Sequence, residues 1–261
     1  MGHRILGQLP ATRNWKKVIA LLKATDSVDR IANATSQAAS RGLELAKRDK
    51  GVARVAFALM KVIWASRKEQ FFEELAELGI SVSAQASLLD VVGAFDDALD
   101  RSLRQAGHRT DLAEMARFSA IDAMSNICRS ETGNLFGATA VDVQNALKKY
   151  ATPERFGSVG QNFFGWFLYR FYDYHLSREL ANHIGFGKQF ASMTACQDFK
   201  DGLALYCLQT ARIVKEFSGC WPSATKFREG ITAENVRTKF VPVAFKKIKS
   251  ELKQRSGSAN A

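Results

Sequence analysis

The sequence has few of the residues that interrupt helices or cross-link a small protein. Its 261 residues include only four prolines and four cysteines. Few prolines leave long helices uninterrupted. The cysteines are widely spaced and no two stand at a metal-binding interval, which favours reduced structural thiols over a disulfide framework. They are Cys128, Cys196, Cys207 and Cys220.

A long apolar run is also missing. The most apolar window, residues 52–65, is too short to cross a bilayer and contains Arg54 and Lys61. No unbroken apolar region follows the first basic residues, which argues against a signal peptide. We therefore expect a protein without a transmembrane segment that is located in the cytoplasm.

Familiar catalytic and cofactor signatures do not occur. The chain has no GxxxxGK[ST] phosphate loop, GxSxG elbow, HExxH motif or paired CxxC. Gly185-Phe186-Gly187 follows a helical pattern and not a strand, so it favours a helix C-cap over a dinucleotide loop. The sequence predicts neither a cofactor nor a metal.

Apolar residues recur at spacings of three and four throughout, and no segment alternates as a strand does. This pattern predicts an all-α fold of nine or ten helices without a sheet, in a single domain of residues 1–255. The loop at 129–138 is the best candidate boundary between an N-terminal layer, 1–129, and a C-terminal layer, 139–255. The tail 256–261 is expected to be disordered.

Two segments are predicted to lie at the centre of the fold. Val52–Trp64 is apolar nearly all round, as a buried helix is. Phe163–Tyr174 holds eight aromatic residues within a helix expected from about Gly160 to Ile184. Such a dense aromatic run is more typical of a core than of a base-stacking surface.

Other positions predict where helices begin and end. Thr139 and Asp142 have the spacing of a capping box. A helix opening at Asp198 is expected to end at Gly219, before a Trp221-Pro222 corner. Pro242 is expected to kink or restart the last helix, because proline lacks the backbone N–H donor.

The net charge of +11 is distributed unevenly. Residues 1–68 hold 14 Lys/Arg and four Asp/Glu, and residues 226–261 hold nine and three. Between these ends, residues 69–114 hold ten acidic and three basic residues. Either the charges pair within the protein, or the basic ends form a face for a polyanion such as nucleic acid. The candidate nucleic-acid contacts are Lys239, Lys246, Lys247, Lys249 and Lys253.

The aromatic stripe continues into His175, Glu179 and His183, each four residues from the last. Residues eight apart in a helix are separated by about 12 Å, so one ion could take two of these side chains but hardly three. With no second ligand group evident, the pattern favours a polar stripe whose members bond one another.

The same segment contains two Arg-x4-His patterns, from Arg170 to His175 and from Arg178 to His183. These resemble the motif of the HEPN ribonucleases, small all-helical proteins that use Arg-x4–6-His, usually across a dimer. The resemblance implies metal-independent RNA cleavage, with His183 or His175 as acid and base and Arg178 or Arg170 stabilising the phosphate. Glu179 would be the polar residue that follows the arginine.

The sequence thus leaves three hypotheses open. The leading one is a non-enzymatic helical subunit of a multi-protein, nucleic-acid-associated complex. It would use its basic N- and C-terminal faces to bind other protein subunits, DNA or RNA, or further copies of itself. The alternative is a HEPN-like endoribonuclease. The third is a membrane-surface protein that uses the amphipathic helix at residues 232–253.

Overall fold

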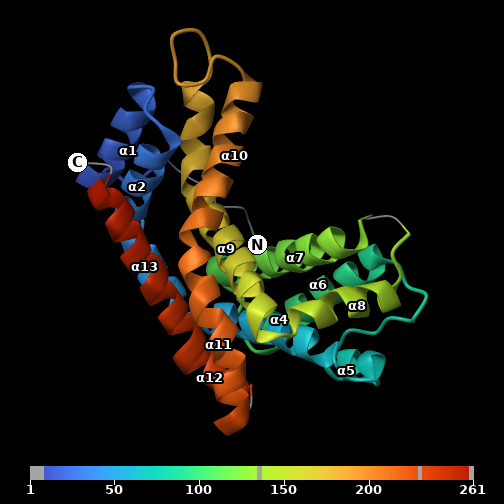
Figure 1. The fold of residues 1–261 in the computed structure, drawn as a ribbon. Coiled ribbons are helices and arrows are strands. Elements are labelled where there is room, and N and C mark those ends of the chain that lie inside the picture. Colours follow the sequence, from blue (N-terminus) through green and yellow to red (C-terminus); the bar gives the residue numbers. More distant parts are fainter. Residues whose placement is uncertain (1–8, 134–136, 229–230, 259–261) are drawn as a thin grey trace.

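The computed structural model describes residues 9–133, 137–228 and 231–258. Every regular element in these ranges is helical, and the only strand-like pairings there are two isolated β-bridges. The predicted all-α class is therefore confirmed (Figure 1). The predicted count of nine or ten helices is slightly low, because three short helices accompany ten that have eleven residues or more.

The helices follow one another with short connections. The first half of the chain forms α1 (Arg13–Lys23), α2 (Val28–Ala38), α3 (Ser40–Ala46), α4 (Lys50–Ala65), α5 (Phe71–Glu77), α6 (Leu88–Gln105) and α7 (Asp111–Thr132). The second half forms α8 (Ala140–Tyr150), α9 (Pro153–Leu180), the 3-10 turn η1 (Ala181–His183), α10 (Met193–Thr210), α11 (Arg212–Arg228), α12 (Ala233–Asn235), the π turn η2 (Val236–Phe240) and α13 (Val241–Ser258).

Polar caps determine where several helices begin. The predicted capping box of Thr139 and Asp142 is present at the start of α8, and Ser87 and Asp90 form a second one at α6. At α4 the carboxylate of Asp49 accepts a hydrogen bond from the backbone N–H of Val52, in the first turn of the helix. Each cap satisfies N–H groups that have no partner inside the helix.

Helix α9 is the central element, with α7 and α8 packed on it as well as α10 and α11 (Figure 1). It starts at Pro153, earlier than the expected start near Gly160, and forms one helix of 28 residues that includes the aromatic segment. Phe163, Phe164, Phe167 and Phe171 are all buried. The prediction that this aromatic segment forms core is confirmed.

Glycines allow α9 to lie very close to α11. A Cβ atom on Gly157 would stand 2.3 Å from the backbone oxygen of Lys215, and one on Gly160 would stand 2.5 Å from Oγ of Ser218. Real Cβ atoms do not approach other atoms so closely. The two backbones therefore meet at a distance that only glycine permits at these positions.

The predicted helix end at Gly219 is wrong. The segment forms two helices, α10 and α11, that join at Ala211, and α11 continues helically past Gly219 and Trp221 to Arg228. A Cβ on Gly219 would lie 2.8 Å from the backbone oxygen of Pro153. This glycine serves close helix packing and not a turn.

The end of the chain is more helical than expected. Pro242 lies in the first turn of α13, directly after the π turn η2, so the predicted restart at this proline is confirmed. The missing N–H of Pro242 leaves the carbonyl four residues earlier without its α-helical donor, which accounts for the irregular turn. Because α13 reaches Ser258, residues 256–258 are helical where a disordered tail was predicted, and 259–261 lie outside the described residues.

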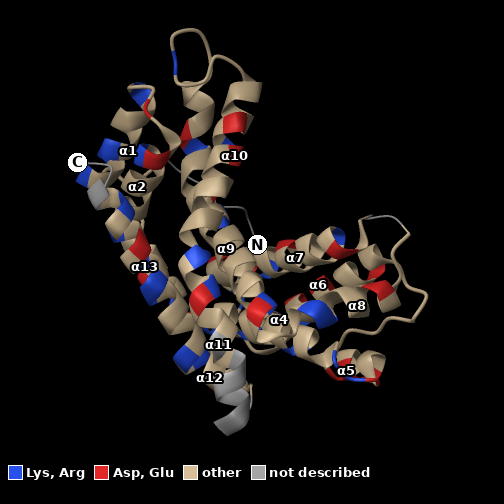
Figure 2. Ribbon diagram, in the orientation of Figure 1, with Lys and Arg blue, Asp and Glu red and all other residues tan. Residues whose placement is uncertain are grey.

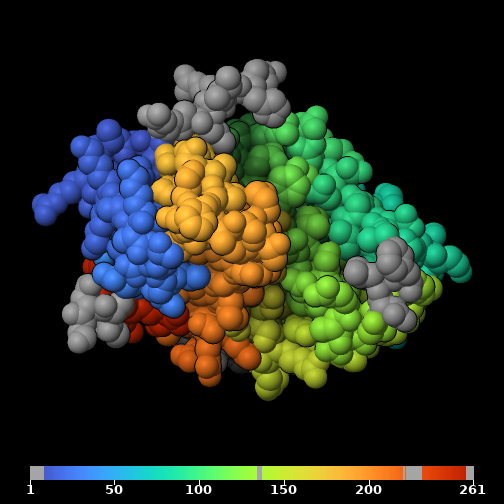
Figure 3. All heavy atoms as spheres, turned by 90° about the horizontal axis from the view of Figure 1, so that it is seen from above, coloured from blue at the N-terminus to red at the C-terminus, as the bar shows by residue number. Residues whose placement is uncertain are grey.

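The first two helices lie beside α13. Helix α2 packs on α1 and also contacts α9, α10 and α13. In Figure 1 α1, α2 and α13 occupy one side of α9, whereas α5, α6 and α8 occupy the other. From above, the blue surface of the first helices adjoins the red surface of α13 (Figure 3). One connected hydrophobic cluster extends from Leu9 to Leu252, so helices of the two predicted layers share a core.

The helices of the described residues include none that is long and apolar enough to cross a membrane.

Candidate functional site

His175, in the polar half of α9, lies among aromatic rings. Its ring centroid is 4.9 Å from that of Trp15, 5.3 Å from Phe171 and 5.2 Å from Tyr174. Burial, assisted by the charge of Arg178, lowers the pKa of His175 to about 4. The imidazole is therefore neutral at pH 7.

His183 lies at the end of η1 and is only 6% exposed. Burial lowers its pKa, the carboxylate of Glu179 opposes that effect, and the charges of Lys23 and Lys188 add to it. The backbone oxygen of His183 accepts a hydrogen bond from the N–H of Phe190, at 3.0 Å. The residue thus anchors the loop that joins α9 to α10.

The two arginines of the Arg-x4-His patterns have separate surroundings. Arg170 forms an ion pair of 2.6 Å with Asp122 of α7. Burial raises the pKa of Asp122, and the charge of Arg170 opposes this. The guanidinium of Arg178 lies 4.6 Å from the ring centroid of Tyr174. Arg170 therefore ties α9 to α7, while Arg178 covers an aromatic ring on its own helix.

The structure thus brings the sequence candidates together in pairs. His175 interacts with the charge of Arg178, and His183 with that of Glu179. Arg170 belongs to the contact with α7. In the part of the chain that the structure describes, no three His, Cys, Asp or Glu side chains gather where they could hold a metal ion.

A second candidate site arises where the basic ends of the chain meet. Residues 13–48 hold eight Lys/Arg and three Asp/Glu, and residues 237–255 hold seven and one. Figure 2 shows these blue segments along α1, α2 and α13, on the side of the molecule away from the acidic residues of α5. The sequence shows two basic segments, but only the fold places them together.

These helices enclose a polar groove. A pocket of about 360 Å³ lies between α2 and α13, and a smaller pocket of about 30 Å³ beside α1 shares three residues with it. We refer to both together as the basic groove. Its polar and charged lining residues are Lys17, Arg30, Asn33, Ser36, Gln37, Ser40, Lys249, Lys253 and Ser256.

The cations of the basic groove differ in how far they are already paired. Lys249 forms an ion pair of 2.6 Å with Glu44, and Arg30 forms one of 2.7 Å with Asp26. Lys17 and Lys253 are exposed, and neither has an acidic partner within the described ranges. Lys17 and Lys253 are therefore the cations of the groove best placed to form ion pairs with a ligand.

The floor of the groove contains a fixed amide. Asn33 is 7% exposed, and its side-chain oxygen accepts a hydrogen bond of 2.7 Å from the hydroxyl of Tyr206. Because the oxygen has this partner, the amide N–H groups remain as donors. Donors and ammonium groups on one surface suit a ligand with anionic oxygens.

Only part of the predicted lysine set contributes to the groove. Lys249 and Lys253 line it. Lys247 lies 6.0 Å from the ring centroid of Phe217, and Lys239 belongs to η2. Sequence reasoning missed Lys17 and Arg30, whose only signal was the basic character of the N-terminal segment.

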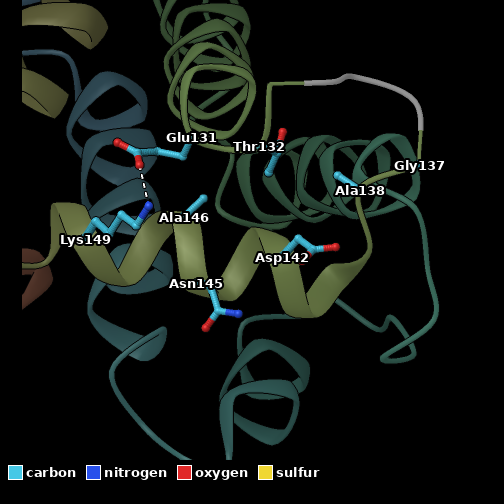
Figure 4. Close-up of a pocket in the computed structure, with 8 residues that line it drawn as sticks. All are labelled: Glu131, Thr132, Gly137, Ala138, Asp142, Asn145, Ala146 and Lys149. Carbon is cyan, nitrogen blue, oxygen red and sulfur yellow. Dashed lines mark hydrogen bonds and ion pairs between the residues drawn. The ribbon is translucent and has the colours of Figure 1, made fainter.

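A further pocket of about 430 Å³, between the end of α7 and α8, has its charges engaged in structural contacts (Figure 4). Glu131 forms ion pairs of 2.6 Å with Lys149 and 2.7 Å with Arg155. Asp142 caps α8. These interactions leave the pocket with no unpaired acid and base side by side among the residues that the structure describes.

No family model matches the chain, and no curated protein or solved structure resembles it significantly.

Proposed function

We propose that this protein is a non-enzymatic helical protein that binds nucleic acid through the basic groove, as a subunit of a nucleic-acid-associated assembly. The observation that carries the proposal is the convergence of α1, α2 and α13 on one groove of ammonium, guanidinium and amide donors. The helices of the acidic block, α5 and α6, lie on the other side of α9 (Figure 1).

The groove suits phosphates more than a specific base sequence. Its ammonium and guanidinium groups can contact phosphate oxygens. Such contacts position a nucleic acid but do not distinguish one base from another. Binding of this kind depends on salt, with a slope of about −0.9 per phosphate neutralised on duplex DNA and about −0.7 on a single strand. We therefore expect modest affinity, little sequence preference and loss of binding at high salt.

The alternatives have less support in the surroundings of their residues. The ribonuclease alternative needs a base and a phosphate-binding arginine, but Arg170 is paired with Asp122 and aromatic rings surround His175. The membrane alternative needs a free apolar face on α13. The apolar side of that helix, including Phe245 and Ile248, is buried in the core.

Fluorescence anisotropy with labelled DNA and RNA oligonucleotides at 50 and 200 mM salt tests the proposal. A variant carrying Lys17→Ala, Arg30→Ala and Lys253→Ala is expected to bind about tenfold or more weakly. It should also have a shallower salt slope, by about 0.7 to 0.9 for each phosphate that is no longer neutralised.

The matched control removes three exposed cations outside the groove, as Arg67→Ala, Arg129→Ala and Lys148→Ala. An equal decrease in affinity in the two variants would mean that only net charge matters, and no binding at 50 mM salt would refute the proposal. Incubation with RNA in the presence of EDTA tests the ribonuclease alternative, which predicts metal-independent cleavage. RNA cleavage that disappears in His183→Ala would favour that alternative instead.

A further inference from the structure

A separate cationic pocket lies where the start of α4 meets the segment before α7 and the π turn η2. It has a volume of about 400 Å³ and shares no residue with the basic groove. Its polar side chains come from three distant parts of the sequence, which supply Lys50 and Arg54, then His108, and then Glu234 with Arg237. Ala53, Phe57 and Ala233 give it an apolar wall.

Positive charge exceeds negative charge in this pocket. Two guanidinium nitrogens of Arg237 donate hydrogen bonds of 2.7 to 3.0 Å to the carboxylate of Glu234. Arg54 is bonded only to a neutral group, the hydroxyl of Ser102, at 3.0 Å. Lys50 is exposed and has no acidic partner among the residues described. Two cations therefore remain without a counter-charge in the described part of the chain.

His108 adds an unsatisfied polar atom to the same wall. Its Nδ1 is shut off from solvent and has no hydrogen-bond partner in the described structure. Buried polar atoms without partners are uncommon, and a bound ion or ligand is one of the usual reasons for them. The two unpaired cations and a histidine with an unsatisfied ring nitrogen thus line one pocket.

The walls of the pocket are fixed without a ligand. Asp49 accepts hydrogen bonds from the backbone N–H of Val52, at 2.9 Å, and from the hydroxyl of Thr110, at 2.8 Å. A Cβ on Gly51 would lie 2.4 Å from the backbone oxygen of His108, so the two segments are in tight contact. A preformed site loses little conformational entropy on binding.

We infer that this pocket binds a phosphate group, carried either by a small molecule or by the end of an oligonucleotide. A guanidinium fork and an ammonium group are the side chains that hold phosphate oxygens best. The volume falls in the range of small-molecule sites, and the half-buried Phe57 offers a surface to the apolar part of such a ligand.

Isothermal titration with inorganic pyrophosphate, at an ionic strength held constant with sodium chloride, tests this inference. The wild-type protein is expected to bind pyrophosphate, and Lys50→Ala with Arg54→Ala is expected to lower its affinity at least tenfold. Lys148→Ala, which removes an exposed cation on α8, should leave the affinity unchanged. Absence of pyrophosphate binding, or an equal decrease in Lys148→Ala, would overturn the inference.

Two further measurements keep the test clear. Lys50 is exposed, and its side chain makes no ion pair or hydrogen bond with another described residue, so Lys50→Ala alone is expected to keep the fold intact. The groove variant with changes at Lys17, Arg30 and Lys253 should retain pyrophosphate binding, which separates this site from the proposed nucleic-acid function.

A pair of oligonucleotides distinguishes the two sources of phosphate. If the ligand is a nucleic-acid end, a 5′-phosphorylated oligonucleotide should bind more tightly than its 5′-hydroxyl counterpart, and the Lys50 and Arg54 double variant should lose that preference. If the ligand is a small molecule, the two oligonucleotides should bind equally while pyrophosphate still binds.

Discussion

The close contact between α9 and α11 allows a direct test of the packing. Gly157→Ala replaces a mid-helix glycine, a change that normally stabilises a helix by about 0.5 to 1 kcal/mol. Here the added Cβ would stand 2.3 Å from the backbone oxygen of Lys215. A backbone carbonyl cannot rotate aside as a side chain can, so α11 must move away from α9. Overpacking of this kind typically costs about 1 to 3 kcal/mol.

Gly93 provides the matched control, because it lies on the exposed face of α6 and a Cβ there would meet nothing within 4 Å. Gly93→Ala should therefore raise the free energy of unfolding by about 0.5 to 1 kcal/mol, whereas Gly157→Ala should lower it by about 1 to 2 kcal/mol. Urea unfolding measures both, and in thermal melts each kcal/mol corresponds to a shift of about 2 to 4 °C. If Gly157→Ala is as stable as Gly93→Ala, the close approach of the two helices is refuted.

Two further predictions concern titratable groups. His175 has a pKa of about 4 in the folded protein, and a histidine in an unfolded chain titrates near about 6.5, so the unfolded chain binds more protons between these values. Acidification from pH 7 to 5 should thus lower stability, by about 1 kcal/mol for this partly buried ring, and His175→Gln should show a smaller decrease in urea unfolding. Burial raises the pKa of Cys128 to about 12 and that of Cys207 well above its usual value. In a Cys220→Ser background, the native protein should therefore react with a thiol reagent far more slowly than the urea-unfolded protein, and rapid native labelling would contradict the burial.

The helices themselves were predictable from the sequence to a large extent. Apolar spacing identified the fold class and the buried aromatic half of α9, and the capping-box spacing of Thr139 and Asp142 identified the start of α8. The wrong prediction concerned glycine, which can end a helix or allow two helices to pack closely. Gly219 looked like a helix end, but its role depends on Pro153, more than sixty residues earlier in the chain. Local pattern contains no information about which residue a glycine will face.

The candidate sites show the same limit. The sequence revealed a basic C-terminal segment, but not that Lys253 would share a groove with Lys17. It also gave no sign of the proposed phosphate pocket, because Lys50 and Arg237 lie in two basic segments that are far apart in the sequence and meet only in the fold. Both sites depend on the packing of helices that are distant in the chain, and no local spacing rule encodes that packing.

The basic groove also has a consequence for the order of events during synthesis. The α1 and α2 wall leaves the ribosome before the α13 wall does. A growing chain therefore carries positive charge long before it has a shaped surface on which to hold a ligand. A fragment that stops before α13 would keep that charge and lack the groove, so the proposed binding requires a chain that has been translated through α13.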